Sequence, residues 1–190
     1  MKLSAYVIIF SLFLSQCSSV SNIVSKGCIE ASKFDQGLSY DFCVAYLSNW
    51  QPPSSNAEDY WVNSIQLLKS NGTKLLSFIS KLLNDKNFDE RTKDSLKGCF
   101  DSYKDTLSEL DAAVVAFKAK DLDTAAIKVS ESLDTPLICQ RSFNHPKGGN
   151  SSPLTKQNHA YFQLNVIPSV LIQILTKHSS SKLFYSYFHN

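Results

Sequence analysis

Two cysteines on neighbouring helical repeats constrain the fold of this chain more than any other feature. Apolar residues recur at steps of three or four over residues 96–117 and again over 122–143, as on one face of each of two helices. If these helices lie antiparallel about Lys120, Cys99 precedes the turn by 21 residues and Cys139 follows it by 19. At a rise of about 1.5 Å per residue, both cysteines then lie at nearly the same height along the pair.

The first 21 residues form a predicted secretory signal peptide. Lys2 precedes an apolar run over residues 5–14, and small polar residues follow up to Ser21. A membrane anchor is the alternative interpretation, but a run of this length is too short to span a bilayer. The chain is therefore predicted to be secreted, with Cys17 removed together with the peptide.

Four cysteines remain after the signal is removed, and an even number in a secreted protein predicts two disulfides. Four cysteines allow three pairings, and the matched heights favour Cys99–Cys139 because a disulfide needs its Cα atoms within about 7 Å. This choice leaves Cys28 to pair with Cys43, both before the Pro-Pro break at 52–53. The short loop is expected to contribute about 3 kcal/mol and the long loop about 4 kcal/mol to stability.

Charge leaves the type of partner open. The signal removes Lys2, one of 19 basic residues, so 18 basic residues face 17 acidic ones and the net charge is +1. Such a balance does not favour binding to nucleic acid or to an anionic membrane surface. Neither is expected as a partner.

The mature chain is expected to form one all-α domain over residues 22–178. Residues 23–50 are predicted to fold into a disulfide-closed helical hairpin, which ends before a Pro-Pro linker. Four long helices with short connections follow over residues 55–178, and short connections make neighbouring helices antiparallel. The predicted fold is therefore an up-down-up-down four-helix bundle, followed by an aromatic-rich tail over residues 179–190.

Local signals predict where these helices begin and where they are disturbed. Ser55 and Glu58 form a candidate capping box for the first bundle helix, and Ser152 is a candidate N-cap for the last. Pro136 and Pro168 fall inside the third and fourth bundle helices, where proline is expected to interrupt or bend the helix. The predicted core stripes are Trp61, Ile65, Leu68, Gly72, Leu75, Ile79 and Leu82 in the first helix, and Tyr161, Leu164, Pro168, Leu171 and Leu175 in the last.

The sequence contains no constellation for catalysis. It has neither a nucleophile elbow nor a phosphate-binding loop, and no two histidines have the spacing of a helical metal site. Acidic residues are spread along the helices, as expected for a solvated face. We therefore expect no enzymatic activity, no metal and no cofactor. The four histidines considered are His145, His159, His178 and His189.

Two sequons make Asn71 and Asn150 candidate N-glycosylation sites. Asn150 lies in a predicted loop and is the better acceptor. Asn71 lies beside the apolar stripe of a predicted helix, so its use is left open. A glycan at either residue would exclude the surrounding patch from a tight interface.

Short motifs beside the cysteines and before the last helix match those of a known family. These motifs are Tyr40-Asp41-Phe42-Cys43-Val44, Leu96-Lys97-Gly98-Cys99 with Tyr103, Ser132-Leu133-Asp134 before Cys139 and Phe143, and Ser152-Pro153-Leu154-Thr155. With them, the chain resembles the plant invertase/pectin methylesterase inhibitor family over about residues 23–177. The likeness extends to members known as invertase inhibitors and pollen allergens.

This resemblance implies an inhibitor of either a pectin methylesterase or an acid invertase, acting in a one-to-one complex that covers the substrate cleft of the enzyme. Some invertase-type members carry Pro-Lys-Phe where this chain has Leu122-Asp123-Thr124, and many members carry an acidic pair where it has Gln140-Arg141. The target therefore stays open between the two enzymes. The implied location is the cell wall and apoplast, or the vacuole.

The residues predicted to contact the target surround the turn at Lys120 and follow the third bundle helix. A rigid helical surface favours binding because little conformational entropy is lost on association. The alternative function is a non-inhibitory secreted module that binds a small apolar ligand or signals to a receptor. The predicted contact residues are Asp121, which is also the predicted N-cap of the third helix, Asp123, Thr124, Lys128, Gln140 and Arg141.

Overall fold

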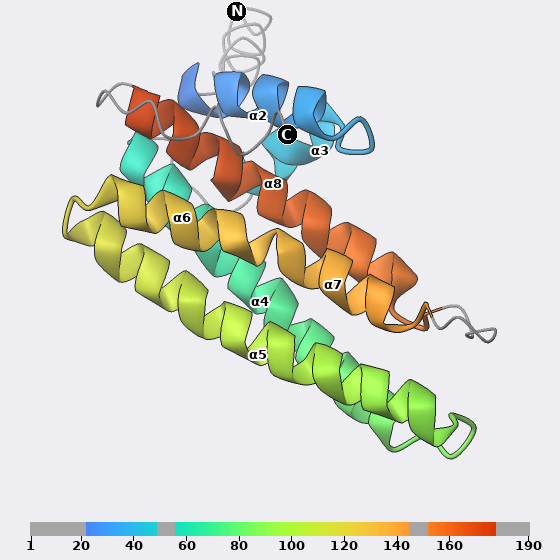
Figure 1. Cartoon of the computed structure of the whole chain (residues 1–190). Helices are drawn as coiled ribbons and strands as arrows, with labels where there is room; N and C mark the ends of the chain where they lie inside the picture. Colours follow the sequence, from blue (N-terminus) through green and yellow to red (C-terminus); the bar gives the residue numbers. More distant parts are fainter. Residues whose placement is uncertain (1–21, 49–55, 145–151, 178–190) are drawn as a thin grey trace, which may run out of the picture.

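The computed structural model describes residues 22–48, 56–144 and 152–177, and in these ranges it contains helices and no strand. The predicted signal peptide, the sequon at Asn150 and the aromatic tail lie outside the described residues. Figure 1 shows a short pair of helices lying across one end of a longer bundle. The helices are α2 (Asn22–Phe34), α3 (Tyr40–Ser48), α4 (Ala57–Leu83), α5 (Glu90–Lys118), α6 (Leu122–Ser132), α7 (Asp134–Ser142) and α8 (Thr155–Lys177).

The bundle consists of α4, α5, the α6–α7 pair and α8 (Figure 1). On one side α5 packs between α4 and α6–α7, and on the other side α8 packs against the same two partners. Helix α4 and the α6–α7 pair therefore occupy opposite corners of the bundle. The predicted all-α, up-down-up-down fold is confirmed. Trp61 is a fully buried core residue, as predicted, and stacks on Phe117 with ring centroids 4.2 Å apart; Tyr103 is also fully buried.

The first bundle helix begins one residue later than predicted. The capping box is formed by Asn56 and Asp59, rather than by Ser55 and Glu58. Asp59 N donates to Asn56 Oδ1 at 2.9 Å, and Asn56 N donates to Asp59 Oδ2 at 3.3 Å. Asparagine is as strong an N-cap as serine, and the Asp59 carboxylate three residues later accepts the bond that completes the box.

The third bundle helix is interrupted, as predicted from the presence of Pro136. Helix α6 ends at Ser132 and α7 starts at Asp134, so Pro136 is the third residue of α7. In the first turn of a helix the backbone N–H has no intrahelical acceptor, so the N–H that proline lacks is not missed there. Leu133 between the two helices keeps helical dihedral angles, with φ −66° and ψ −29°. The two helices therefore follow each other with little change of direction.

Helix α8 is buried on more sides than the predicted single stripe implied. Every residue over 164–172 is buried, because α2 covers the face of α8 that the bundle leaves open. The approach is close at Gly27, where an added Cβ would lie 2.5 Å from Leu171 Cδ2. The helix continues through Pro168, whose carbonyl oxygen accepts a hydrogen bond from Trp61 Nε1 at 3.1 Å. This bond ties α4 to the middle of α8.

Both predicted disulfides are present. Cys99 and Cys139 join α5 to α7 with Cα atoms 5.0 Å apart. Cys28 and Cys43 join α2 to α3 with Cα atoms 5.5 Å apart. The nearly equal distances of Cys99 and Cys139 from the turn at Lys120 therefore predicted the pairing that is present.

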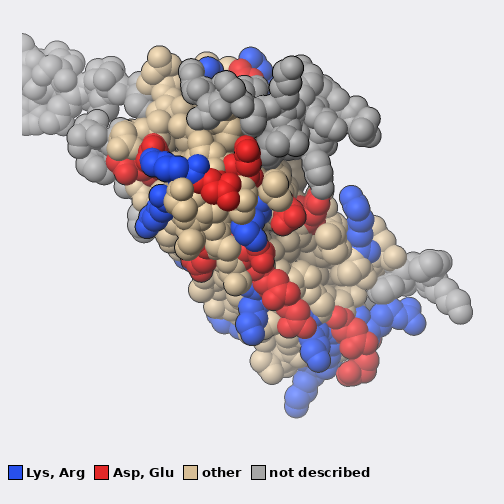
Figure 2. Space-filling model, turned by 60° about the vertical axis from the view of Figure 1, so that its left-hand side comes forward, with Lys and Arg blue, Asp and Glu red and all other residues tan. Residues whose placement is uncertain are grey.

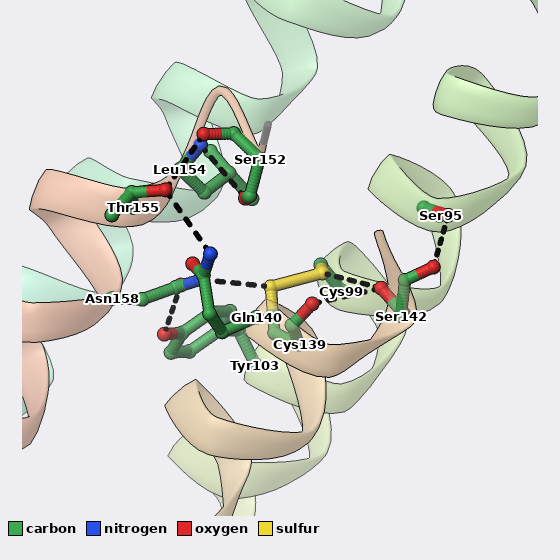
Figure 3. The surroundings of a disulfide bond; sticks show 10 residues. All are labelled: Ser95, Cys99, Tyr103, Cys139, Gln140, Ser142, Ser152, Leu154, Thr155 and Asn158. Atoms are coloured by element: carbon green, nitrogen blue, oxygen red, sulfur yellow. Dashed lines mark hydrogen bonds between the residues drawn. A yellow bond between two sulfur atoms is a disulfide. The ribbon is translucent and has the colours of Figure 1, made fainter. Parts of the chain in front are cut away.

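A chain of hydrogen bonds surrounds the disulfide between α5 and α7 (Figure 3). Tyr103 Oη donates to Asn158 Oδ1 at 2.9 Å, and Asn158 Nδ2 donates to Gln140 Oε1 at 3.0 Å. Gln140 Nε2 in turn donates to Thr155 Oγ1 at 3.1 Å. These bonds connect α5, α7 and α8. Because Asn158 is only 3% exposed, they pair polar atoms that would otherwise be buried alone.

Candidate interaction surface

The turn between α5 and α6 is a well-defined corner. Lys120 has a φ of 66°, in the left-handed region where glycine is usual, and its N–H donates to Phe117 O at 2.9 Å. The N–H of Asp121 donates to Ala116 O at 3.0 Å, which completes a Schellman motif. Lys120 Nζ lies 2.7 Å from Glu58 Oε1 at the start of α4. The corner is therefore connected to a third helix.

Asp121 caps α6, as predicted. Its Oδ1 accepts a hydrogen bond from Thr124 N at 3.1 Å. Hydrogen bonds from the side chain and then the backbone of Thr124 lower the pKa of the Asp121 carboxyl. Asp123 is exposed in the first turn of the same helix, where a negative charge interacts favourably with the helix dipole. Both carboxylates therefore stabilise the start of α6.

Lys128 forms an ion pair with Glu109 that bridges α6 and α5. The hydrogen bond with Glu109 raises the pKa of the Lys128 ammonium, and the charges of Glu109 and Glu131 act in the same direction. Lys128 therefore remains charged through the physiological pH range and links α6 to α5.

The last two predicted contact residues lie at the far end of α7. Gln140 is partly buried, and its amide is used in the hydrogen bonds to Asn158 and Thr155. Arg141 is exposed in the last turn of α7. At about 1.5 Å per residue, the 20 residues from Asp121 to Arg141 place these ends about 30 Å apart. The six predicted residues therefore follow the length of α6–α7 instead of forming one patch.

The outward face of α6–α7 also carries apolar residues that were not among the predicted contact residues. Ile127 is 52% exposed and Ile138 is 56% exposed. The helical periodicity did indicate that Ile127 is exposed, because this residue falls outside the core stripe through Ala126 and Val129. Since Leu133 preserves the helical phase, exposed residues at steps of three or four form one continuous face. We call this face the outer stripe: Asp123, Ile127, Glu131, Asp134, Ile138 and Arg141.

The outer stripe is acidic, with three carboxylates and one guanidinium. Helix α5 packs beside it and carries exposed residues of both signs, among them Lys97, Asp101, Lys104 and Asp105. Figure 2 shows a row of acidic side chains along the bundle, with lysine and arginine beside it. An acidic face with two exposed isoleucines complements a partner surface that has an apolar centre and a basic rim.

The sequon at Asn71 lies within α4, where the residue is half-buried. Its Nδ2, the atom to which a glycan would be attached, donates to Leu67 O at 2.9 Å. Glycosylation of Asn71 remains a prediction. Among the described residues, no group of three or more His, Cys, Asp or Glu side chains could hold a metal ion. Over the same ranges, no helix has the length and apolar character needed to cross a membrane.

Two solved structures have the same fold as this chain. The crystal structure of a pectin methylesterase inhibitor from Arabidopsis thaliana matches with a TM-score of 0.56 at 21% identity, covering 82% of this chain and 97% of that chain. A mutant form A of a pectin methylesterase inhibitor from Arabidopsis gives a TM-score of 0.61 at 20% identity, covering 76% and 96%. These structures share the helical-bundle fold of this chain.

The sequence then shows the family. The model of the Plant invertase/pectin methylesterase inhibitor family matches residues 17–171, and the chain belongs to this family. A Platanus acerifolia protein named "Putative invertase inhibitor" is 34% identical over 181 residues, which cover 92% of this chain and 99% of that protein. "Pectinesterase inhibitor 12" of Arabidopsis thaliana is 31% identical over 177 residues, which cover 92% and 100%. Members of the family are inhibitors, and the chain is not an enzyme.

Proposed function

We propose that this protein is a secreted inhibitor that binds a pectin methylesterase or an acid invertase one to one and covers its substrate cleft. The observation that carries the proposal is that relatives named for each type of enzyme match the chain over almost their whole length. The predicted signal peptide and the two disulfides support an extracellular location, in the cell wall or apoplast or alternatively in the vacuole.

The outer stripe is the surface that we propose for binding. The disulfide to α5, the capped corner and the hydrogen bonds of Gln140 hold α6–α7 in place, so association orders few groups. Ile127 and Ile138 supply exposed apolar anchors among charged neighbours, which is the anatomy of a protein interface. Of the predicted contact residues, Asp123 and Arg141 lie on this face.

The other four predicted contact residues have structural roles in this proposal. Asp121 and Thr124 cap α6, Lys128 joins α6 to α5, and Gln140 joins α7 to α8. In this proposal they hold the outer stripe in position. Asp121, which is exposed, also lies at the end of that face.

Enzyme assays test the proposal directly. The purified chain is mixed with a pectin methylesterase and, separately, with an acid invertase at the mildly acidic pH of the plant cell wall. Inhibition of one enzyme identifies the target, and a titration end point at equimolar protein supports the one-to-one complex. Full activity of both enzymes at micromolar excess would refute the inhibitor function for these enzymes and favour the non-inhibitory binding module.

Variants test the surface. Ile127→Asp and Ile138→Asp are each expected to weaken inhibition by about tenfold or more, since an interface anchor contributes about 1.4 kcal/mol or more. Val115→Asp is the matched control, because Val115 is 68% exposed but belongs to α5. It lies one turn beyond Asp111, which pairs with Lys69 of α4, and so faces away from α6. Equal effects of all three variants would contradict the assignment of the outer stripe.

A further inference from the structure

A hydrogen-bonded polar pair is buried between α6 and α8. Asn165 is 0% exposed and Ser132 is 3% exposed. Asn165 Nδ2 donates to Ser132 Oγ at 2.7 Å, and Ser132 Oγ in turn donates to the carbonyl oxygen of Val129, in its own helix, at 2.6 Å. Leu164 and Val166, the neighbours of Asn165 along α8, are buried apolar residues. The pair therefore lies inside a largely apolar interface between two helices.

Stability alone does not explain this pair. A buried hydrogen bond replaces bonds to water, so its net gain is small, and replacing both partners by apolar groups of similar shape is often neutral or stabilising. The best-attested effect of a buried polar group at a helix interface is to fix the register of one helix against the next. The pair between Ser132 and Asn165 is therefore a candidate for setting the orientation of α6 on α8.

Helix α7 has attachments of its own. The disulfide between Cys99 and Cys139 joins it to α5, and Thr135 Oγ1 forms a hydrogen bond with Thr106 Oγ1 of α5 at 2.6 Å. Both attachments lie beyond Leu133, the residue at which α6 gives way to α7. They hold α7 in place and leave the orientation of α6 to other contacts.

The buried face of α6 is nearly smooth. Its buried residues are Ala125, Ala126, Val129 and Ser132. Helices interlock by fitting ridges of side chains into grooves, and alanine side chains form only low ridges. The ion pair between Lys128 and Glu109 lies at the surface, where such pairs contribute little. The bond from Asn165 to Ser132 thus adds a directional contact to a face that is otherwise made of small apolar side chains.

We propose that Asn165 is a positioning residue for target binding: through Ser132 it fixes the rotation and the axial position of α6, so that Ile127 faces outward. Ile127 precedes Ser132 by five residues, and at 3.6 residues per turn the two side chains point about 140° apart. A rotation of α6 that breaks the bond to Asn165 therefore also turns Ile127 away from the outer stripe. The effect on inhibition rests on the proposed function, whereas the effect on the orientation of α6 does not.

The test replaces the Asn165 amide by an apolar group of nearly the same size. Asn165→Leu removes the bond between the helices and leaves the Ser132 hydroxyl group bonded to the carbonyl oxygen of Val129. The midpoint of urea unfolding is expected to stay at or above the wild-type value. NMR relaxation dispersion is expected to reveal exchange on the microsecond-to-millisecond timescale in residues 122–132 and not in α5. A fall of the outward orientation to about a tenth of the population is expected to weaken inhibition of the target enzyme about tenfold.

Ser64→Ala is the matched control. Ser64 is also fully buried, but its Oγ donates to the carbonyl oxygen of Trp61 within α4 at 2.6 Å, so its loss frees no neighbouring helix. This variant is expected to leave both the dispersion profile and the inhibition at wild-type values. The double variant Asn165→Leu/Ser132→Ala removes both side-chain polar groups of the pair and is expected to behave as Asn165→Leu does.

The outcomes separate this proposal from the proposed function. The proposal is overturned if Asn165→Leu shows no exchange in α6, if Ser64→Ala shows the same exchange, or if Asn165→Leu inhibits an enzyme as strongly as wild type does. A wild-type chain that inhibits neither enzyme refutes the proposed function alone, and the dispersion profile then still decides whether Asn165 positions α6.

Discussion

Two buried phenols, Tyr103 and Tyr161, provide a matched test of how much a single hydrogen bond stabilises this bundle. We call them the phenol pair: their rings meet edge-on in the core, and their Oη atoms differ in environment. Tyr103 Oη donates to Asn158 Oδ1 at 2.9 Å, whereas Tyr161 Oη has no partner in the described residues. Replacing either residue by phenylalanine removes one oxygen atom and keeps the ring.

The expected magnitudes follow from what each substitution leaves behind. Tyr103→Phe leaves Oδ1 of Asn158 without its donor in a side chain that is 3% exposed. An unsatisfied buried acceptor costs about 1–3 kcal/mol, and this is the expected loss in the free energy of unfolding. Tyr161→Phe removes a hydroxyl group that gains nothing on folding, so stability is expected to stay unchanged or to rise slightly.

Urea unfolding with the disulfides intact, followed by far-UV circular dichroism, measures both variants. At equal m-values, the midpoint of Tyr103→Phe should fall, and that of Tyr161→Phe should stay at or above wild type. Thermal unfolding should show the same order, with about 2–4 °C for each kcal/mol in a domain of this size. Coinciding midpoints for the two variants would refute the reasoning, because they would show that the bond to Asn158 makes no net contribution.

Four further changes have expected outcomes. Gly72→Ala should destabilise by up to about 2 kcal/mol in urea unfolding, because its Cβ would lie 2.6 Å from Leu107 Cδ2 and 3.1 Å from Cε2 of the buried Tyr161 ring, and this overpacking exceeds the gain in helix propensity; Gly98→Ala, with nothing within 4 Å, should stabilise by up to about 1 kcal/mol. Joint replacement of Cys99 and Cys139 by alanine should cost about 4 kcal/mol in the same assay; an unchanged midpoint would contradict the loop-entropy argument. Burial raises the pKa of both members of the phenol pair, so above pH 10 the unfolded chain loses these protons first. Stability should therefore fall with rising pH, by about 1.4 kcal/mol per phenol at pH 11, and a flat profile between pH 9 and 11 would contradict their burial.

The regular helices could be predicted because their periodicity is strict. On α4, residues such as Ile65, Leu68 and Ile79 alternate at steps of three and four, and all three are fully buried. The disulfide pairing was accessible for a similar reason, because helical rise converts sequence distance into height. The start of α4 was wrong by one residue, since Ser55 and Asn56 are competing caps and local sequence does not rank them.

The surroundings of α8 could not be predicted from its own residues. Asn165 and Ser169 look like a solvated face, yet both are buried. Asn165 Nδ2 donates to Ser132 Oγ of α6 at 2.7 Å, and Ser169 Oγ donates to the Asn165 carbonyl oxygen at 2.8 Å. Only the tertiary partner explains why a polar residue is tolerated inside, and that partner lies 33 residues away in sequence.

The candidate site was predicted in part. The charged residues Asp123 and Arg141 were selected because exposure is the usual state of charged side chains on a helix, and both are exposed. Ile127 and Ile138 were missed because an apolar residue in a helical pattern is normally taken to be core. Their exposure depends on the exact phase of α6–α7 against α5 and α8, which a pattern of residue types does not specify.

The central position of α8 has a consequence for biosynthesis. Helices α2, α4, α6 and α7 all pack against α8, although it is the last of the described helices to be synthesised. Cys28 and Cys43 are only 15 residues apart and can be oxidised while translation continues. The apolar faces that these helices turn to α8 stay uncovered until the segment ending at Lys177 has left the ribosome. Folding of this protein is therefore expected to be completed after translation and to depend on chaperones during that interval.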